Sequence, residues 1–316
     1  MSKIAFLLAP LAAVLVGLLP ATPAQAAART FVSAAGSDSN NCTTTATPCR
    51  HLQAAYSATS PGGEIAVLDP ANYGSLTITG PISIEGNNGW AFLSAASGAN
   101  AITITPQGLN DTINIRGVVL DGAGIAGNTG IRLNGGNLTI RDSVIRNFGN
   151  YGLDLPSSLL GGTRQIFVSN TLIADNGSDG IHSENGGAAT LNEIFNHVRV
   201  QNNGGNGIWL EDVFGGFNAT ITDSVIANNV ICGILVSGDT LTGNVMVRNS
   251  TIVNNSGAGL SAVGDEAIIR VTRSTISGNN TGWYTDLGGV VQSYGDNNID
   301  GNTNANTEPP NPLTYK

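Results

Sequence analysis

The chain is acidic and rich in glycine, and both properties limit what it can do. It has 316 residues, with 22 acidic and 13 basic side chains, a formal net charge of −9 and 42 glycines. This charge argues against nucleic acid or an anionic membrane as a partner. The only lysines are Lys3 and Lys316, which argues against a mechanism that uses a lysine base.

Residues 1–26 have the features of a secretory signal peptide. Lys3 gives a positive start, residues 4–19 form an apolar run interrupted by Pro10, and Ala24-Gln25-Ala26 is a small-residue cleavage site. The run is too short and too broken for a membrane anchor, and no later segment is apolar enough to span a bilayer. Removal of this segment takes away the charge of Lys3 and changes the net charge from −9 to −10. We expect a secreted or periplasmic monomer with no membrane insertion.

Residues 27–75 are predicted to form an amino-terminal cap. A strand and a turn-rich loop come first, then one short helix near residues 51–60 that ends at Pro61-Gly62-Gly63, then a strand and a turn. A helix placed here would cover the open β edge of a solenoid, which otherwise invites aggregation. In an exported protein, Cys42 and Cys49 are expected to form a disulfide, leaving Cys232 as a free thiol.

Residues 76–300 carry a repeat that predicts a parallel β-helix. Short runs alternate apolar and polar residues, which is the strand pattern. Six stretches align on a glycine, at spacings of 28, 27, 26, 26 and 23 residues: Gly152, Gly180, Gly207, Gly233, Gly259 and Gly282. An apolar β-branched residue lies seven positions before each of the first five: Ile145, Ile173, Val200, Ile226 and Ile252. Coils of this length bury their apolar faces only by stacking. Residues 301–316 lack the repeat and are expected to form a loose tail.

Polar residues mark two turns in each coil. The second turn carries a run of asparagines: Asn147, Asn176, Asn203, Asn229 and Asn255. Asparagine tolerates left-handed backbone, and its amide can bond to the equivalent amide of the next coil. We therefore interpret these asparagines, and His197 at the first turn, as structural.

Several segments resemble the right-handed parallel β-helix, or pectin-lyase-like, superfamily. TFVSAAGSDSN and LQAAYSATSPGGEIAVLDPANYG resemble the cap of exported bacterial members, INIRGVVLDG and GIRLNGGNLTIRDSVIRN resemble their repeat, and SYGDNNIDGN resembles a closing coil. The resemblance covers nearly the whole mature chain and implies an all-β right-handed solenoid with a short capping helix. The superfamily includes pectate lyases, polygalacturonases, alginate epimerases, tailspikes and adhesins, so it does not fix an activity.

Two enzyme signatures of this superfamily are present only in part. Asp179-Gly180-Ile181 resembles a polygalacturonase strand, but Gly205-Asn206 stands where those enzymes have a second acidic pair. Tyr151-Gly152-Leu153-Asp154 resembles the Tyr-Gly-Phe-Asp-Pro-His strand of mannuronan epimerases, but Leu155-Pro156 replaces the last two residues and removes the histidine.

Strand alternation predicts which side chains face outward after each repeat glycine. The residue after the glycine points inward, and the next one points outward. The first outward column is Arg132, Asp154, His182, Trp209, Leu235, Ser261 and Tyr284. The second outward column is Asn134, Pro156, Glu184, Glu211, Ser237 and Val263. Successive members should lie about 4.8 Å apart.

This face is the candidate site. Tyr151, Asp154 and His182 are the candidate catalytic residues, as proton-transfer groups. The candidate substrate-binding residues are Arg132, Asp179, Glu184, Trp209 and Glu211. An arginine can pair with the carboxylate of an acidic sugar, and an outward tryptophan can stack on a sugar ring. Carboxylates bind hydroxyls or Ca²⁺, whereas the scattered cysteines and histidines argue against zinc. No other cofactor is expected.

Three functions fit these observations. The leading hypothesis is an exported β-helix protein that binds polysaccharide on its outer strand face. The first alternative is a lyase or epimerase acting on a uronate polymer, and the second is a non-catalytic structural or adhesive surface protein. A glycosidase would need two carboxylates about 5–10 Å apart, which Asp154, Glu184 and Glu211 could provide.

Overall fold

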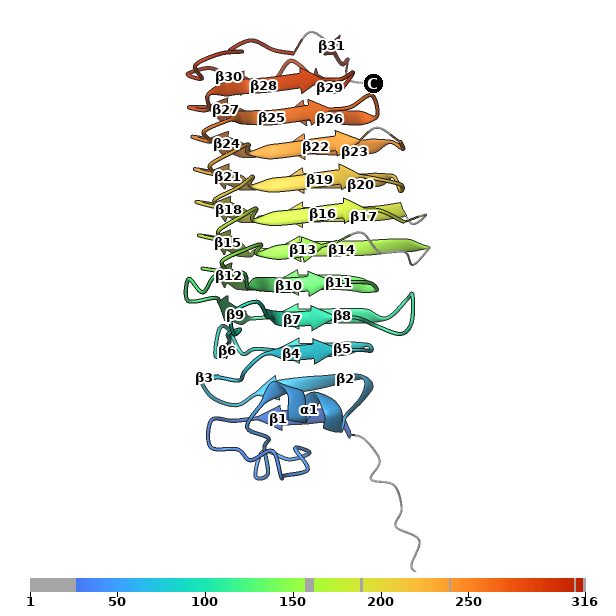
Figure 1. The fold of residues 1–316 in the computed structure, drawn as a ribbon, viewed down its shortest axis with the longest axis vertical. Coiled ribbons are helices and arrows are strands. Elements are labelled where there is room, and N and C mark those ends of the chain that lie inside the picture. The colour runs from blue at the N-terminus through green and yellow to red at the C-terminus, as the bar shows by residue number, and fades with distance from the viewer. Residues whose placement is uncertain (1–26, 157–161, 188–189, 239, 310, 315–316) are drawn as a thin grey trace, which may run out of the picture.

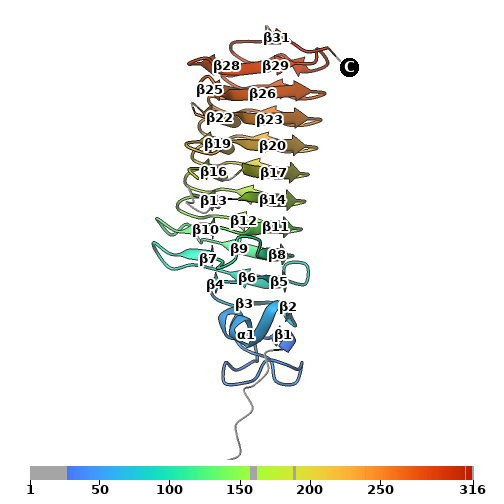
Figure 2. The same cartoon turned by 90° about the vertical axis from the view of Figure 1, so that its right-hand side faces the viewer.

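The computed structural model describes residues 27–156, 162–187, 190–238, 240–309 and 311–314. These residues form a single right-handed parallel β-helix in which the coils stack along one axis (Figure 1). The view turned by 90° shows the same stack, with the cap at one end and β31 at the other (Figure 2). All strand pairings between coils are parallel, as the repeat predicts. The expected signal peptide lies outside the described residues.

Each complete coil contributes one strand to each of three sheets, here named A, B and C, and the coils at the two ends are incomplete. Sheet A contains β1 (Ala27–Val32), β2 (Thr59–Val67), β5 (Ile82–Glu85), β8 (Thr112–Arg116), β11 (Asn137–Arg141), β14 (Thr163–Ser169), β17 (Thr190–Asn196), β20 (Phe217–Thr222), β23 (Gly243–Arg248), β26 (Ala267–Thr272), β29 (Val290–Ser293) and β31 (Asn311–Pro312). Sheet B contains β3 (Ala71–Asn72), β6 (Ala91–Leu93), β9 (Val118–Asp121), β12 (Val144–Arg146), β15 (Leu172–Ala174), β18 (Arg199–Gln201), β21 (Val225–Ala227), β24 (Thr251–Val253), β27 (Thr275–Ser277) and β30 (Asn298–Ile299). Sheet C contains β4 (Leu76–Ile78), β7 (Asn100–Ile104), β10 (Thr129–Leu133), β13 (Leu153–Leu155), β16 (Ile181–Asn185), β19 (Ile208–Asp212), β22 (Ile234–Gly238), β25 (Ala258–Val263) and β28 (Thr281–Asp286).

The core runs through the middle of the coils. The five β-branched residues that precede the repeat glycines are fully buried in one column of sheet B, and Ile276 continues it. The residues that follow the glycines are fully buried in sheet C from Leu153 to Leu260. The predicted inward register is therefore confirmed in both sheets.

The repeat glycines are required by close packing between coils. None of the six has a positive φ, so backbone conformation does not demand them. A Cβ built on Gly207 would lie 2.6 Å from the carbonyl oxygen of Gly233 and 2.5 Å from the Cγ2 of Ile226. The other five have similarly close neighbours, so each marks a corner with no room for a side chain.

The asparagine turn separates into two roles that the sequence did not distinguish. A buried ladder of side-chain hydrogen bonds runs along Asn176, Asn203, Asn229, Asn255, Asn279 and Asn302, at 2.9–3.0 Å between successive amides. Left-handed backbone belongs instead to the residue one position earlier: Asn147, Asp175, Asn202, Asn228 and Asn254. Asn147 is therefore a turn residue and lies outside the ladder. His197 has a φ of +54°, as expected for a turn residue, and its structural interpretation stays a prediction.

The cap has one helix, α1 (Leu52–Ala58), packed against β1 and β2. Leu52 and Ala55 of this helix are buried. The chain enters β2 at Thr59, earlier than the Pro61-Gly62-Gly63 end expected from sequence, because residues 59–67 extend along β1. Cys42 and Cys49 form the predicted disulfide, with their Cα atoms 4.9 Å apart, and Cys232 is free.

Residues after 300 contact the last coil more closely than a loose tail would. The backbone N–H groups of Thr303 and Asn304 donate to the carbonyls of Asn279 and Asn280, and β31 pairs with β29. The Asn302 side chain is buried as the last member of the ladder. Among the described residues, no helix is long and apolar enough to cross a membrane.

Candidate functional site

Four adjacent strands of sheet C place the predicted outward column in register. Arg132 of β10 pairs with Asp154 of β13, Asp154 with His182 of β16, and His182 with Trp209 of β19. The second column aligns in the same way, with Glu184 beside Glu211. We call Arg132, Tyr151, Asp154, His182, Glu184, Trp209 and Glu211 the sheet C cluster.

Asp154 lies between two basic groups. The Nη1 of Arg132 donates to Asp154 Oδ2 at 2.9 Å, and the Nδ1 of His182 lies 3.0 Å from Asp154 Oδ1. Asp154 is 2% exposed and His182 is 7% exposed, whereas the Arg132 side chain is 42% exposed. The sequence predicted the outward direction of this column, but Asp154 and His182 are covered and do not form open surface.

Aromatic rings cover the imidazole of His182. The Tyr151 ring stacks on it with centroids 4.9 Å apart and an interplanar angle of 18°, and the Trp209 ring lies 4.8 Å away at 47°. The indole N–H of Trp209 donates to the hydroxyl of Ser237 at 2.9 Å. The Nε2 of His182 is buried and has no hydrogen-bond partner among the described residues. The cluster therefore has a rim of Arg132, Tyr151 and Trp209 over a floor made by His182 and Asp154.

The acidic residues around the cluster raise the pKa values of His182 and Tyr151, which favours these two side chains as proton donors rather than as bases. Burial alone would lower the pKa of His182, but the hydrogen bond and charge of Asp154, with Asp179 and Glu184, raise it above its ordinary value. Burial and the charges of Asp179 and Asp154 raise the pKa of Tyr151. A protonated imidazole and an un-ionised phenol can both donate hydrogen bonds to a ligand oxygen.

The remaining acidic residues of the prediction separate into buried and accessible groups. Asp179 is 4% exposed, and its carboxylate accepts hydrogen bonds from the backbone and side-chain N–H groups of Asn206. Asp179 is therefore not part of the surface of the site, although its charge acts on His182 and Tyr151. Glu184 and Glu211 are half-buried, and burial together with the charge of Glu184 raises the pKa of Glu211.

Two residues of this region were missed as contributors. Asn206 holds Asp179, and Ser237 holds Trp209. Ser237 belongs to the predicted second outward column and lies in the coil next to Trp209, two residues beyond its register partner Leu235. This position was the sequence signal that could have predicted the contact. Among the described residues, no group of three or more His, Cys, Asp or Glu side chains could hold a metal ion.

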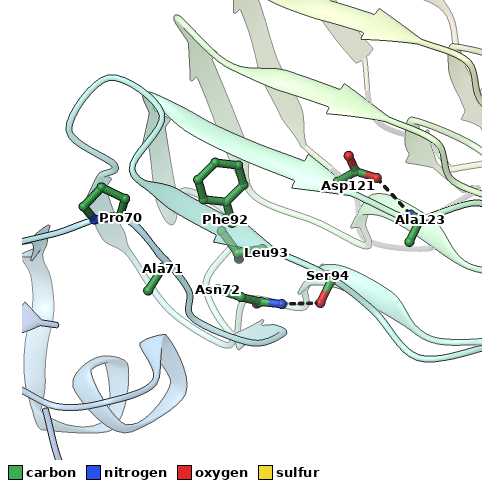
Figure 3. A pocket seen from close by; sticks show the side chains of 8 residues that line it. All are labelled: Pro70, Ala71, Asn72, Phe92, Leu93, Ser94, Asp121 and Ala123. Carbon is green, nitrogen blue, oxygen red and sulfur yellow. Dashed lines mark hydrogen bonds between the residues drawn. The ribbon is translucent and has the colours of Figure 1, made fainter. Parts of the chain in front are cut away.

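A cavity of about 670 Å³ lies on a different face, in sheet B between β3, β6 and β9 (Figure 3). Phe92 projects over it, while Asn72 donates to Ser94 and Asp121 accepts from the backbone of Ala123. Its polar groups are thus already paired with one another. We place the candidate site at the sheet C cluster, where one polar atom is buried without a partner and charged groups converge.

The family described as Right handed beta helix region matches residues 100–275, so the chain belongs to the right-handed β-helix family. Among solved structures, the chain is similar to pectate lyase Pel9A, with a TM-score of 0.54 and 16% identity over 86% of this chain and 70% of that one.

The A-modules of two Azotobacter vinelandii mannuronan C-5 epimerases are also similar. AlgE6 matches with a TM-score of 0.45 and 17% identity over 84% of this chain and 93% of that one. AlgE4 matches with a TM-score of 0.48 and 17% identity over 81% and 90%. At these identities the similarities concern the fold alone. No curated protein sequence matches the chain.

Proposed function

We propose that the protein binds an extended polysaccharide across the outer face of β10, β13, β16 and β19. The observation that carries this proposal is the row formed by the half-buried rings of Tyr151 and Trp209, which lie on either side of the covered imidazole of His182, with Arg132 beyond Tyr151. Aromatic faces stack on sugar rings, and an arginine binds a carboxylate or hydroxyl oxygens. Glu184 and Glu211, in the next outward column, would accept hydrogen bonds from sugar hydroxyls.

The length of the row matches a polymer better than a single sugar. Arg132 and Trp209 lie three coils apart, which corresponds to about 14 Å at about 4.8 Å per coil. A polymer lying along the solenoid axis would meet each coil in turn. Ca²⁺ bound between the acidic residues and the polymer stays a prediction, as do secretion through residues 1–26 and a monomeric state.

A uronate lyase or epimerase is the second candidate, because of the Asp154–His182 pair. The carboxylate of Asp154 orients the imidazole, and the buried Nε2 of His182 has no partner, so it could exchange a proton with a ligand once the ring of Tyr151 or Trp209 moves aside. Arg132 would neutralise the uronate carboxylate. The raised pKa of His182 favours the role of proton donor, so the base in such a reaction would have to be a different group.

The test compares two outward aromatic residues of the same column. Trp209→Ala should weaken binding to polygalacturonate or alginate about 10- to 100-fold, by analogy with the loss of one stacking platform on a nucleic-acid base. Tyr284→Ala removes an exposed ring three coils further along and should leave affinity unchanged. Affinity is measured by isothermal titration calorimetry and stability by thermal melting.

Equal binding by both variants, or a lower melting temperature of Trp209→Ala without a change in affinity, would contradict the proposal. Absence of binding to acidic and neutral polysaccharides alike would favour the structural or adhesive alternative. The ultraviolet absorbance of unsaturated uronate, measured for wild type and His182→Gln, separates a lyase from a binding protein.

A further inference from the structure

A second charged site lies on sheet A, on the last coils of the solenoid. A cavity of about 560 Å³ there is lined by three arginines, Arg248 of β23, Arg270 of β26 and Arg273. Only 13 residues of the chain are basic, and its net charge is −9. Three arginines at one cavity therefore make a local positive charge that the composition as a whole does not predict.

These arginines are only partly neutralised by the protein. The Nε of Arg273 lies 3.7 Å from an Asp296 carboxylate oxygen that also accepts from the hydroxyl of Thr272. Arg270 donates to the side-chain carbonyl of Asn244, which is uncharged. Among the described residues, Arg248 forms no ion pair, although its charge contributes to the lowered pKa of Asp223. The cavity thus keeps positive charge available for an oxyanion.

The backbone at Arg273 adds to this observation. The equivalent turn of the five preceding coils has left-handed backbone at a shorter polar side chain: Asp142, Asn170, His197, Asp223 and Asn249. Arg273 adopts the same conformation, with a φ of +50°, although a long side chain is less tolerant of it than asparagine or aspartate. Arg273 therefore brings a guanidinium group to the cavity although its left-handed backbone conformation is unfavourable for a long side chain.

The cavity also has apolar walls, which narrow the class of ligand. Met246, Tyr294 and Leu313 line it together with the arginines, and the Tyr294 ring is half-buried. Its volume is in the range of small-molecule sites and is much larger than a single phosphate or sulfate ion. Guanidinium groups bind carboxylate or sulfate through paired hydrogen bonds, and an aromatic ring packs on the C–H face of a sugar.

We propose that this cavity binds an acidic saccharide, whose carboxylate or sulfate group lies on Arg248 and Arg270 and whose ring packs against Tyr294. The site is on a different sheet and on later coils than the sheet C cluster, so it does not depend on the function proposed for that cluster. It would give the solenoid a second contact with a charged glycan.

The experiment uses Trp209→Ala protein, in which the sheet C contribution is weakened, and isothermal titration calorimetry at low salt. Trigalacturonate should bind this protein, and a neutral glucose trisaccharide and inorganic phosphate should each bind at least 10-fold more weakly. Adding Arg248→Gln and Arg270→Gln should reduce trigalacturonate affinity at least 10-fold. Arg199→Gln, which removes an exposed arginine of sheet B, is the matched control and should change it less than twofold.

Loss of all trigalacturonate binding in the Trp209→Ala protein overturns the proposal, as does binding that Arg248→Gln and Arg270→Gln leave unchanged. Phosphate binding as tight as the trisaccharide also overturns it, because the cavity would then be a site for free oxyanions only. Full wild-type affinity in Trp209→Ala that disappears with the two arginines would support this site and contradict the one proposed on sheet C. Thermal melting confirms that each variant is folded.

Discussion

At the scale of the residue, the least expected feature of the molecule is a carboxyl group inside its core. Glu193 of β17 is 1% exposed and occupies an inward column whose neighbours in the adjacent coils are Ile166 and Ala219. Neither carboxyl oxygen has a hydrogen-bond partner within normal distance among the described residues. The nearby Ser183 hydroxyl lowers the pKa of Glu193 by less than burial raises it. Burial raises the pKa of Glu193 to about 7.

This carboxyl should make the stability of the protein fall as the pH rises. Its pKa is about 7 in the folded state and near 4.5 when unfolded, so the native state holds the proton more tightly. The stabilisation from this proton is fully present below about pH 4.5 and is lost as the pH rises through about 7. The two pKa values correspond to about 3 kcal/mol.

Glu193→Gln should abolish this part of the pH dependence, and Glu193→Leu should raise stability at pH 8 by removing a buried charge. Urea unfolding at pH 5 and pH 8 measures both effects. The control is Glu308→Gln, which changes an exposed glutamate far along the chain and should keep the wild-type difference between the two pH values. A Glu193→Gln protein that still loses the same stability at pH 8 would place the titration elsewhere.

At the scale of the element, strand alternation predicted direction well and accessibility less well. The columns through His182 and Glu184 follow from a period of two, which is a local property of each strand. The burial of His182 was not predictable, because it depends on the rings of Tyr151 and Trp209 from two neighbouring coils. The burial of Glu193 was also not predictable. A glutamate within a strand can mean either that its side chain points inward or that the alternation has shifted by one residue, and the neighbouring sequence does not distinguish these two cases.

The corner glycines make a prediction about the spacing of the coils. Gly207→Ala places a methyl group 2.6 Å from the backbone oxygen of Gly233, which has no flexible side chain that could move away. We expect the variant to lose about 1–3 kcal/mol of unfolding free energy, typical of overpacking. The matched control is Gly80→Ala, whose new methyl group would meet only the Tyr56 hydroxyl at 3.8 Å. Denaturant unfolding of both variants checks this, and equal stabilities would mean that the coils separate freely at this corner.

At the scale of the whole molecule, the solenoid is a chain of coils that contact only their neighbours in the stack. The buried ladder from Asn176 to Asn302 and the β-branched column from Ile145 to Ile276 each run through six successive coils. The stability of such a structure is approximately a sum of coil and interface contributions. The repeat made this arrangement predictable, because coils that cannot fold alone must stack. The final contacts of residues 302–304 and 311–313 were not predictable, since these residues have no periodic pattern.

A charge placed in this column should therefore act most strongly on the coils next to it. Ile226→Asp introduces an unpaired carboxylate where the side chain is fully buried, which costs several kcal/mol. Its neighbours in the same column are Val200 and Ile252, and hydrogen exchange should show the largest loss of protection in β18, β21 and β24, declining toward the cap. Val225→Asp changes the outward neighbour in the same strand and should leave both melting and exchange nearly unchanged. A uniform loss of protection from the cap to β29 in Ile226→Asp would show instead that the solenoid unfolds as one cooperative unit, and the nearest-neighbour description would have to be abandoned.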